Sequence, residues 1–342
     1  MTDTKIFNSV EAACQCVGIE PRPVRPGAFV RTNVVNDRRG KGDGVIKGHQ
    51  DGKGGIVQNW KTGKQALFFY DYREGQKVTK AVVQAYQREL AARLREEAKQ
   101  TAARHDAVAA LAAQIMQAAK TSISHPYLRR KRVLGAPGAP TFEIDRNAAQ
   151  ALIDRAQIPQ ADGKSQSIRW AGGRLLCVPL TDDRGVLRSL QFIDSNEGTK
   201  IFMKGGQKTG LFWRPDDLPV QSWSREPIGL CEGVATALSV RVLFGLPCVA
   251  GIDAGNLKAA AQNLRRAYPS APIIVFADRD ANNKGELGAK AAAMTVDNVR
   301  VALCPELTPD ELRRFKEITG TDRPTDFNDL MIGRAITPDS KR

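Results

Sequence analysis

The strongest constraint on the fold is the alternation of short apolar runs with segments of helical composition after residue 226. The runs IGLC, LPCVAGI, PIIVFA and NVRVALCP are separated by segments such as VATALSVRVLF and AGNLKAAAQNLRRAYP. Strands that are apolar throughout are buried on both faces, and helical connections between them make the strands parallel. Residues 226–342 therefore predict an α/β domain with a mostly parallel, Rossmann-like sheet.

Acidic residues follow the predicted strands. Glu232 comes directly after IGLC, and Asp278 and Asp280 come after PIIVFA. Asp326 and Asp329 lie in PTDFNDLMIG, beyond the last strand. Ligands bind beyond the carboxyl ends of the strands in open α/β sheets. Crowded carboxylates raise one another's pKa unless a cation compensates them. Oxygen ligands without His or Cys favour Mg²⁺ or Mn²⁺ over zinc.

Each of these acids also has a purely structural interpretation. An Asp-x-Asp pair is common at strand ends and turns, and Glu232 before a glycine can be a turn residue. Asp326 can be the N-cap of a helix that begins FNDLM. The metal-site prediction therefore depends on all five acids occurring together and in order.

Positive charge is concentrated in the N-terminal part of the chain. The net charge is +14, and residues 1–135 hold 24 Lys and Arg against 12 Asp and Glu, whereas residues 226–342 hold 15 of each. Residues 20–75 combine this charge with interleaved aromatic residues and the turn segments KGDG and QDGKGG, which predicts a small β-rich module that binds nucleic acid. The aromatic residues can instead fill a small core. The candidates for DNA contact are Arg38, Arg39, Lys41, Lys47, Trp60 and Lys61.

The middle of the chain predicts a connector and a second α+β part. Residues 77–120 are rich in Ala, Glu, Gln, Arg and Lys without Gly or Pro, which predicts a helix. Residues 174–213 predict strands joined by DDRG and SNEG turns. Lys200, Lys204 and Lys208 recur beside two glycines, a pattern suited to phosphate or to a solvated hairpin end. The predicted division is 1–75, 76–124, 125–225 and 226–342.

Cysteine usage and hydropathy predict a reduced, cytoplasmic protein without a membrane segment. The six cysteines form no CxxC pair, and several lie in apolar runs. Cys14, Cys16 and His49 are conceivable zinc ligands, but no second ligand pair follows them, so no zinc is expected. No apolar run approaches the roughly 20 residues of a transmembrane helix, and the N-terminus lacks the pattern of a signal peptide.

Several ordered motifs resemble those of the Toprim-domain DNA primases of plasmids and phages. They are LCEGVATALSV, CVAGIDAGNL, IIVFADRDANNKG and DFNDL, preceded by HPYLRRKRV, LLCVPLTDDRGVLRSLQFI and GTKIFMKGG, with DGKGGIVQNWKTG near the N-terminus. The resemblance covers most of the chain and is weakest over residues 77–120. A zinc ribbon and a Walker A motif are not visible, and NNKGELG after the acidic pair is longer than the usual turn.

The resemblance implies an α+β primase-core subdomain before a catalytic Toprim domain, and synthesis of RNA primers on single-stranded DNA from ribonucleoside triphosphates, for replication or transfer of a mobile element. It implies that Glu232 binds metal or moves a proton, that Asp278 and Asp280 bind Mg²⁺, and that Lys200 and Lys204 contact phosphate. Asp326 and Asp329 resemble a late acidic motif of this subgroup. A replicative helicase or a single-strand-binding protein is a possible partner.

Two other functions compete with primer synthesis. Toprim modules also occur in topoisomerases and nucleases, so the acids fit a metal-dependent nuclease or phosphohydrolase, although none of the five tyrosines is a convincing topoisomerase nucleophile. The third possibility is a nucleic-acid-binding protein with an inactive Toprim scaffold. Binding that persists in chelator, with no product from labelled nucleotides on single-stranded DNA, would favour this third possibility.

Overall fold

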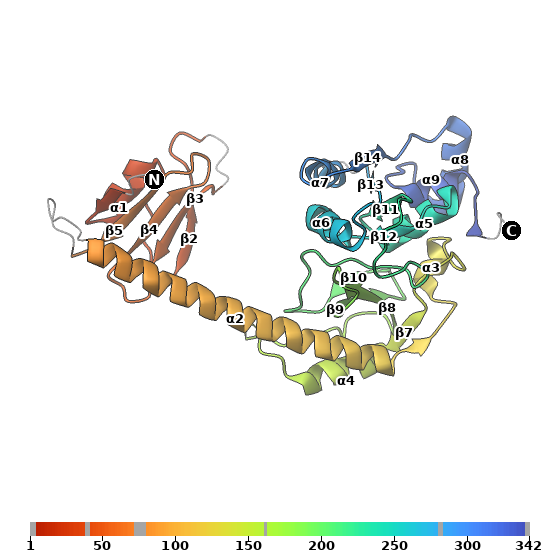
Figure 1. Cartoon of the computed structure of the whole chain (residues 1–342), viewed down its shortest axis with the longest axis horizontal. Coiled ribbons are helices and arrows are strands. Elements are labelled where there is room, and N and C mark those ends of the chain that lie inside the picture. The colour runs from red at the N-terminus through yellow and green to blue at the C-terminus, as the bar shows by residue number, and fades with distance from the viewer. Residues whose placement is uncertain (1–4, 38–41, 72–79, 161–162, 280–282, 339–342) are drawn as a thin grey trace. The chain divides into compact units, whose positions relative to one another are not determined.

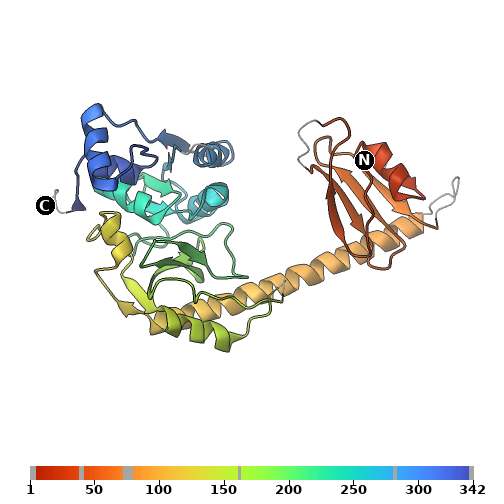
Figure 2. The same cartoon turned by 180° about the vertical axis from the view of Figure 1, so that it is seen from behind.

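The computed structural model describes residues 5–37, 42–71, 80–160, 163–279 and 283–338. The chain consists of two compact units, residues 1–94 (unit 1) and 95–342 (unit 2). Each unit is described by itself below. Figure 1 shows the elements of both, and Figure 2 shows them from behind.

Unit 1 is a five-stranded sheet with one helix. Strands β2 (Phe29–Thr32), β3 (Gly44–Gly48), β4 (Gly54–Asn59) and β5 (Gln65–Phe69) are antiparallel neighbours. Strand β1 (Lys5–Phe7) adds to β5 in parallel, which gives the order β1-β5-β4-β3-β2. Helix α1 (Val10–Val17) begins at the N-cap Ser9 and ends at Gly18, whose φ of 75° suits glycine. It packs against one face of the sheet, where Val57, Ala66 and Phe68 form the core with Val10 and Cys14.

Helix α2 (Lys80–Ala118) matches the helical composition of residues 77–120. Its last turns belong to unit 2, where Val108, Leu111, Ala112 and Ile115 are buried. The preceding part, from residue 91 to 103, is mostly exposed. The four-part division of the chain stays a prediction.

The first sheet of unit 2 is antiparallel and has the order β10-β9-β8-β7-β6. Its strands are β6 (Lys120–Thr121), β7 (Phe142–Asp145), β8 (Arg174–Thr181), β9 (Leu187–Asp194) and β10 (Lys200–Phe202). Helix α4 (Arg146–Ala156) and the end of α2 share a core with this sheet that includes Leu175, Leu190 and Phe192. The short helix α3 (Pro126–Arg130) contributes Tyr127 and Leu128 to a different core, which this sheet shares with the next one.

The second sheet of unit 2 confirms the predicted parallel α/β domain. Strands β11 (Ile228–Cys231), β12 (Cys248–Ala250), β13 (Ile273–Ala277) and β14 (Val299–Leu303) are all parallel, in the order β12-β11-β13-β14. Helices α6 (Leu257–Ala267) and α7 (Lys284–Ala293) pack on one face. Helices α5 (Val234–Phe244) and α9 (Phe327–Gly333) pack on the other. Helix α8 (Pro309–Thr319) lies against α9. The short helix η1 (Ala254–Asn256) precedes α6.

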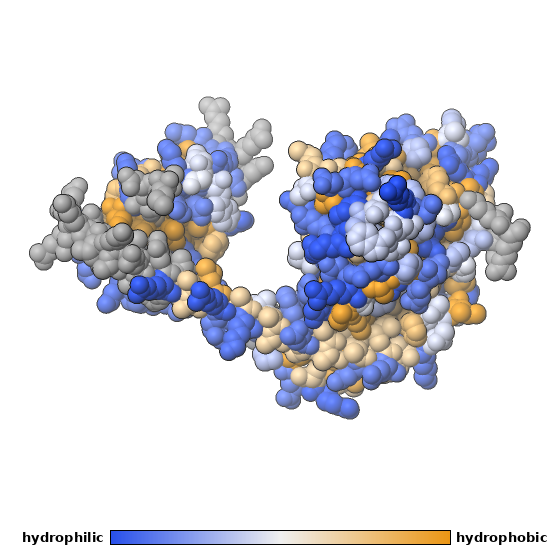
Figure 3. Space-filling view, in the orientation of Figure 1, coloured by the Kyte–Doolittle hydropathy of each residue, from blue (hydrophilic) through white to orange (hydrophobic). Residues whose placement is uncertain are grey.

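Polar side chains dominate the molecular surface in the view of Figure 3, with smaller hydrophobic areas between them. In the part of the chain that the structure describes, no helix combines the length and the apolar character that crossing a membrane requires.

Candidate active site

The chain path makes the neighbouring strands β11 and β13 the switch point of the parallel sheet. From β11 the chain passes through α5 to β12 on one side, and from β13 it passes through α7 to β14 on the other side, with the two helices on opposite faces. Two neighbouring strands whose connections diverge in this way form a topological switch point, where open α/β sheets bind ligands. Glu232 follows β11 and Asp278 follows β13, so these two acids flank the switch point. Both side chains are half-buried.

Asp278 is held by its backbone surroundings. The N–H of Arg279 donates to the carbonyl of Thr325 at 2.7 Å, which joins the end of β13 to the segment before α9. Helix α7 begins directly against the same residue, because a Cβ added at Gly285 would lie 3.0 Å from the Asp278 carbonyl oxygen. The Arg279–Thr325 hydrogen bond thus brings the acid after β13 close to the segment in which α9 begins. Asp280 lies outside the described residues.

Asp326 and Asp329 form a capping box at the start of α9. The N–H of Asp329 donates to Asp326 Oδ1 at 2.9 Å, and the N–H groups of Thr325 and Asp326 donate to Asp329 Oδ2 at 2.7 and 3.4 Å. Thr236, in the first turn of α5, donates its hydroxyl to Asp326 Oδ2 at 3.3 Å. The N-cap interpretation of Asp326 is therefore confirmed. Since a carboxylate has about four acceptor positions, capping leaves room for further ligation.

The electrostatics of nearby groups indicate that the acids converge. Burial raises the pKa of the Cys304 thiol, and the negative charges of Asp326, Asp278 and Asp329 raise it further. Burial also raises the pKa of the Asp329 carboxyl, with the charge of Asp326 as the next cause. One thiol thus lies within the electrostatic reach of acids from β13 and from α9. The edge of the sheet is a region of concentrated negative charge.

The donor set suits a hard cation, because it consists of carboxylate oxygens. Among the described residues, no group of three or more His, Cys, Asp or Glu side chains is already spaced to hold a metal ion. Asp280, which follows Asp278 by two residues, lies outside the described residues. Carboxylate oxygens are compatible with Mg²⁺ or Mn²⁺, and the ion itself stays a prediction.

The structure places the three predicted phosphate lysines in different surroundings. The ammonium of Lys200 lies beside the turn after β11, since a Cβ added at Gly233 would be 3.4 Å from Lys200 Nζ. Lys208 forms an ion pair with Asp253 and lies over the ring of Phe202, 4.4 Å from its centroid. Lys204 donates to the carbonyl of Lys164 at 2.8 Å. Of the three, Lys200 is the lysine whose ammonium lies beside Gly233, the residue that follows Glu232.

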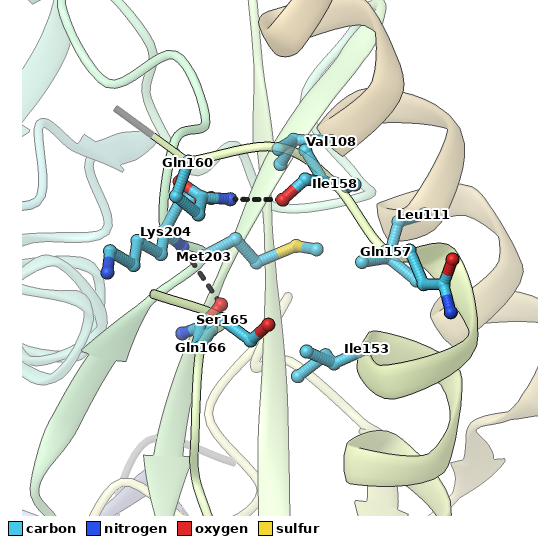
Figure 4. A pocket seen from close by; sticks show the side chains of 10 residues that line it. All are labelled: Val108, Leu111, Ile153, Gln157, Ile158, Gln160, Ser165, Gln166, Met203 and Lys204. Carbon is cyan, nitrogen blue, oxygen red and sulfur yellow. Dashed lines mark hydrogen bonds between the residues drawn. The ribbon is translucent and has the colours of Figure 1, made fainter. Parts of the chain in front are cut away.

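Figure 4 shows the surroundings of Lys204 in more detail. Its backbone N–H donates to Gln166 Oε1 at 2.9 Å, and Gln160 donates to the carbonyls of Ile158 and Lys204, both at 3.3 Å. The lysine side chain extends away from the cavity, which is lined mainly by Val108, Leu111, Ile153 and Met203. Lys204 is therefore part of a local polar network that ties Gln160, Lys164 and Gln166 to the end of β10.

Sequence reasoning missed two charged residues near this edge. Asp253 follows β12 by three residues, caps η1 through the N–H of Asn256 at 3.0 Å and pairs with Lys208. Lys131, at the end of α3, partly opposes through its positive charge the rise in the pKa of the Asp329 carboxyl that burial causes. Its carbonyl accepts a hydrogen bond from Asn328 at 2.7 Å, which docks α3 on α9. Asp253 could have been found from the sequence, because it follows an apolar run that predicts a strand. Lys131 could not, because no local pattern distinguishes it from its basic neighbours.

Three of the six residues of unit 1 predicted to contact DNA lie in the part of the chain that the structure describes. Lys47 lies on β3, and Trp60 and Lys61 follow β4. Lys61 pairs with Asp37 and, at 3.7 Å, with Asp43, so two carboxylates hold its ammonium. Arg38, Arg39 and Lys41 lie outside the described residues.

All six cysteines are free thiols, and Cys14 is buried in the core under α1.

Comparison with known proteins supports these observations. Residues 227–335 match the Toprim domain family. The chain is 27% identical over 305 residues to the DNA primase TraC of Escherichia coli, which covers 86% of this chain and 25% of that protein. The chain thus spans a quarter of the length of this relative.

Two solved structures with lower similarity are also found. The primase fragment of the bacteriophage T7 primase-helicase protein has a TM-score of 0.34 and 20% identity, over 47% of this chain and 58% of that one. The DnaG primase catalytic domain bound to ssDNA has a TM-score of 0.42 and 14% identity, over 71% and 78%. The assignment rests on the two sequence matches and not on these scores. Residues 227–335 therefore form a Toprim domain, in a chain whose sequence is similar to that of a DNA primase.

Proposed function

We propose that unit 2 is the catalytic core of a DNA primase that joins ribonucleotides on a single-stranded DNA template, for replication or transfer of a mobile element. The observation that carries the proposal is the pair of acids, Glu232 and Asp278, on either side of the switch point of the parallel sheet. The Arg279–Thr325 hydrogen bond adds Asp326 and Asp329 to the same edge. A relative that is a DNA primase supports the choice of reaction.

Glu232, Asp278 and Asp280, with Asp326 and Asp329, would hold one or two Mg²⁺ or Mn²⁺ ions. Such an ion, when bound, neutralises the triphosphate and stabilises the charge that develops as the primer 3′-hydroxyl attacks. Thr236 and the capping box fix the orientation of Asp326, so that this side chain is held in place before the substrates arrive. Of these acids, Glu232 is in addition a candidate for moving a proton.

Lysines on the antiparallel sheet and on α3 would bind the phosphates. Lys200 would contact the triphosphate, because its ammonium lies beside the Glu232–Gly233 turn. Lys131 is a second candidate for the triphosphate, since its positive charge acts on Asp329 of α9. Lys208 shares its charge with Asp253, so its contribution to phosphate binding depends on opening that pair. Lys204 stays a candidate for template contact, with its ammonium now directed to a carbonyl.

The proposal is tested by incubating the full chain with circular single-stranded DNA, labelled ribonucleotides and Mg²⁺, and separating the products on a denaturing gel. Asp278→Asn and Glu232→Gln remove charge with little change in volume. Loss of a direct metal ligand is expected to reduce the rate by at least about 100-fold, above the effect typical of outer-shell changes. Asp297→Asn is the matched control, since Asp297 is exposed just before β14, at the opposite edge of the sheet.

Primer synthesis by either variant at the rate of the wild type would overturn the proposal. Shortened DNA with no labelled product would instead support the nuclease alternative. DNA binding that persists in chelator, without any product, would support an inactive scaffold. A helicase or single-strand-binding partner stays a prediction, to be tested by stimulation of synthesis on addition of each.

A further inference from the structure

The sheet of unit 1 has one face that α1 does not cover. Side chains alternate between the faces of a strand, and the register of β2 to β5 aligns those opposite α1 into two rows. We call this surface the open face; its rows are Phe29, Lys47, Ile56 and Leu67, and Arg31, Val45, Gln58 and Gln65. Phe29, Arg31 and Gln65 are exposed, and the others except Val45 are half-buried. The open face extends over four neighbouring strands of the sheet, from β2 to β5.

Two exposed aromatic rings and a guanidinium lie together at one side of the open face. Phe29 is 55% exposed and Trp60 is 42% exposed, and their ring centroids are 6.3 Å apart at an interplanar angle of 37°. The Arg31 guanidinium lies over the Trp60 ring, 4.9 Å from its centroid. Aromatic rings and stacked arginines that face solvent are the groups on which unpaired bases stack.

The charge of the same surface is positive. The charged residues within the five strands are Lys5, Arg31 and Lys47, and none of the strands contains Asp or Glu. Over the whole of residues 1–94 there are 16 Lys and Arg against 9 Asp and Glu. Lys47 stands directly between Phe29 and Ile56 in the first row, so a positive charge alternates with apolar side chains. A single nucleic-acid strand, with its phosphates along one edge and its bases along the other, is complementary to this pattern.

We propose that the open face binds single-stranded DNA, with bases stacked on Phe29 and Trp60 and phosphates held by Arg31 and Lys47. Duplex DNA does not fit as well, because its bases are stacked on one another and cannot lie flat on a sheet. Gln58 and Gln65 supply amide groups at the centre of the surface for base edges. The choice of DNA over RNA rests on the proposed function, whereas the stacking surface stands independently of it.

The test measures binding of the full chain to a short labelled single-stranded oligonucleotide by fluorescence anisotropy, in chelator and without nucleotides. Phe29→Ala is expected to weaken binding about tenfold, within the range for loss of a stacked base. Tyr70→Ala is the matched aromatic control. Tyr70 is 51% exposed, but its ring lies against Phe68, whose side chain points to the α1 side, at 5.5 Å. This variant should bind as the wild type does.

A second pair of variants tests the charge. Lys47→Gln should lower both the affinity and the steepness of its salt dependence. Lys5→Gln is its control, since Lys5 is exposed on the edge strand β1 opposite Ala66, on the α1 side. The inference is overturned if Phe29→Ala and Tyr70→Ala bind equally well, or if duplex of the same sequence competes as well as the single strand. Tighter binding of the matching RNA would overturn the choice of DNA.

The outcome is separable from that of the proposed function. If Phe29→Ala binds normally while Asp278→Asn loses primer synthesis, the open face is not the DNA site and the catalytic assignment stands. If Phe29→Ala weakens binding while Asp278→Asn makes primers normally, the open face is a DNA site in a protein whose reaction is not the one proposed.

Discussion

The parallel sheet of unit 2 and the largely antiparallel sheet of unit 1 present their candidate functional residues in different places. Helices cover both faces of the parallel sheet, and strands β11, β12 and β13 contain no charged residue. The acids Glu232 and Asp278 directly follow the ends of β11 and β13. One helix covers one face of the other sheet, which leaves Phe29 and Arg31 of the edge strand β2 exposed on the opposite face. A covered sheet therefore concentrates its chemistry at an edge, whereas a half-covered sheet spreads it over a surface.

The strongest way to break this comparison is to remove one site and measure both functions. Asp278→Asn is expected to reduce primer synthesis by at least about 100-fold, because it removes a direct ligand. It should not weaken binding of single-stranded DNA, since an acid does not attract phosphate. Gel analysis of products and anisotropy on the same preparation check both outcomes. A parallel loss of affinity would mean that the acidic edge is also needed to bind DNA.

The second prediction concerns how much the packing of helix α7 contributes to the stability of unit 2. A Cβ at Gly288 of α7 would lie 2.4 Å from the carbonyl oxygen of Ala254, so Gly288→Ala overpacks the contact between α7 and η1. We expect a loss of about 1–3 kcal/mol in the free energy of unfolding, measured in urea. Gly173→Ala is the control, with nothing within 4 Å of the added Cβ, and should change stability by less than about 0.5 kcal/mol. Equal stability of the two variants would contradict tight packing of α7.

Substitutions of Asp326 test whether this acid only caps helix α9 or also binds the metal ion. Asparagine is as good an N-cap as aspartate, so Asp326→Asn should leave thermal stability unchanged, whereas Asp326→Ala should lose about 1 kcal/mol. If Asp326 also binds the metal, both variants should reduce primer synthesis, by about tenfold or more. Normal synthesis by Asp326→Asn would restrict this residue to its structural role.

The smallest expected effect concerns charge on unit 1. Binding to a single strand releases counterions with a slope of about 0.7 per phosphate contact, so Lys47→Gln should reduce the salt dependence by about that amount. Lys61→Gln should reduce it less, because Asp37 and Asp43 already hold the Lys61 ammonium. Anisotropy titrations at several salt concentrations measure both slopes. An equal reduction would indicate that DNA displaces the two carboxylates.

The comparison also explains which residues could be found in advance. Glu232 and Asp278 were predictable because an apolar run that ends in an acid marks a strand end, and parallel strands end at one edge. Phe29 and Arg31 were not identified, because neither stands out among the mixed residues around it. Only the position of α1 and the register of β2 show that both side chains lie on the uncovered face of the sheet. Trp60 and Lys47 were predicted from composition alone, and their roles stay predictions.

The sequence by itself determined the parallel α/β character of residues 226–342 and the positions of acids after the strands, because both follow from the periodicity of side chains along the chain. Only the tertiary structure decided that Thr325 meets Arg279, that Thr236 meets Asp326, and that Lys200 stands beside Gly233 while Lys208 pairs with Asp253. Contacts of this second kind join residues far apart in the chain. They depend on strand order, register and helix packing, which local patterns do not encode.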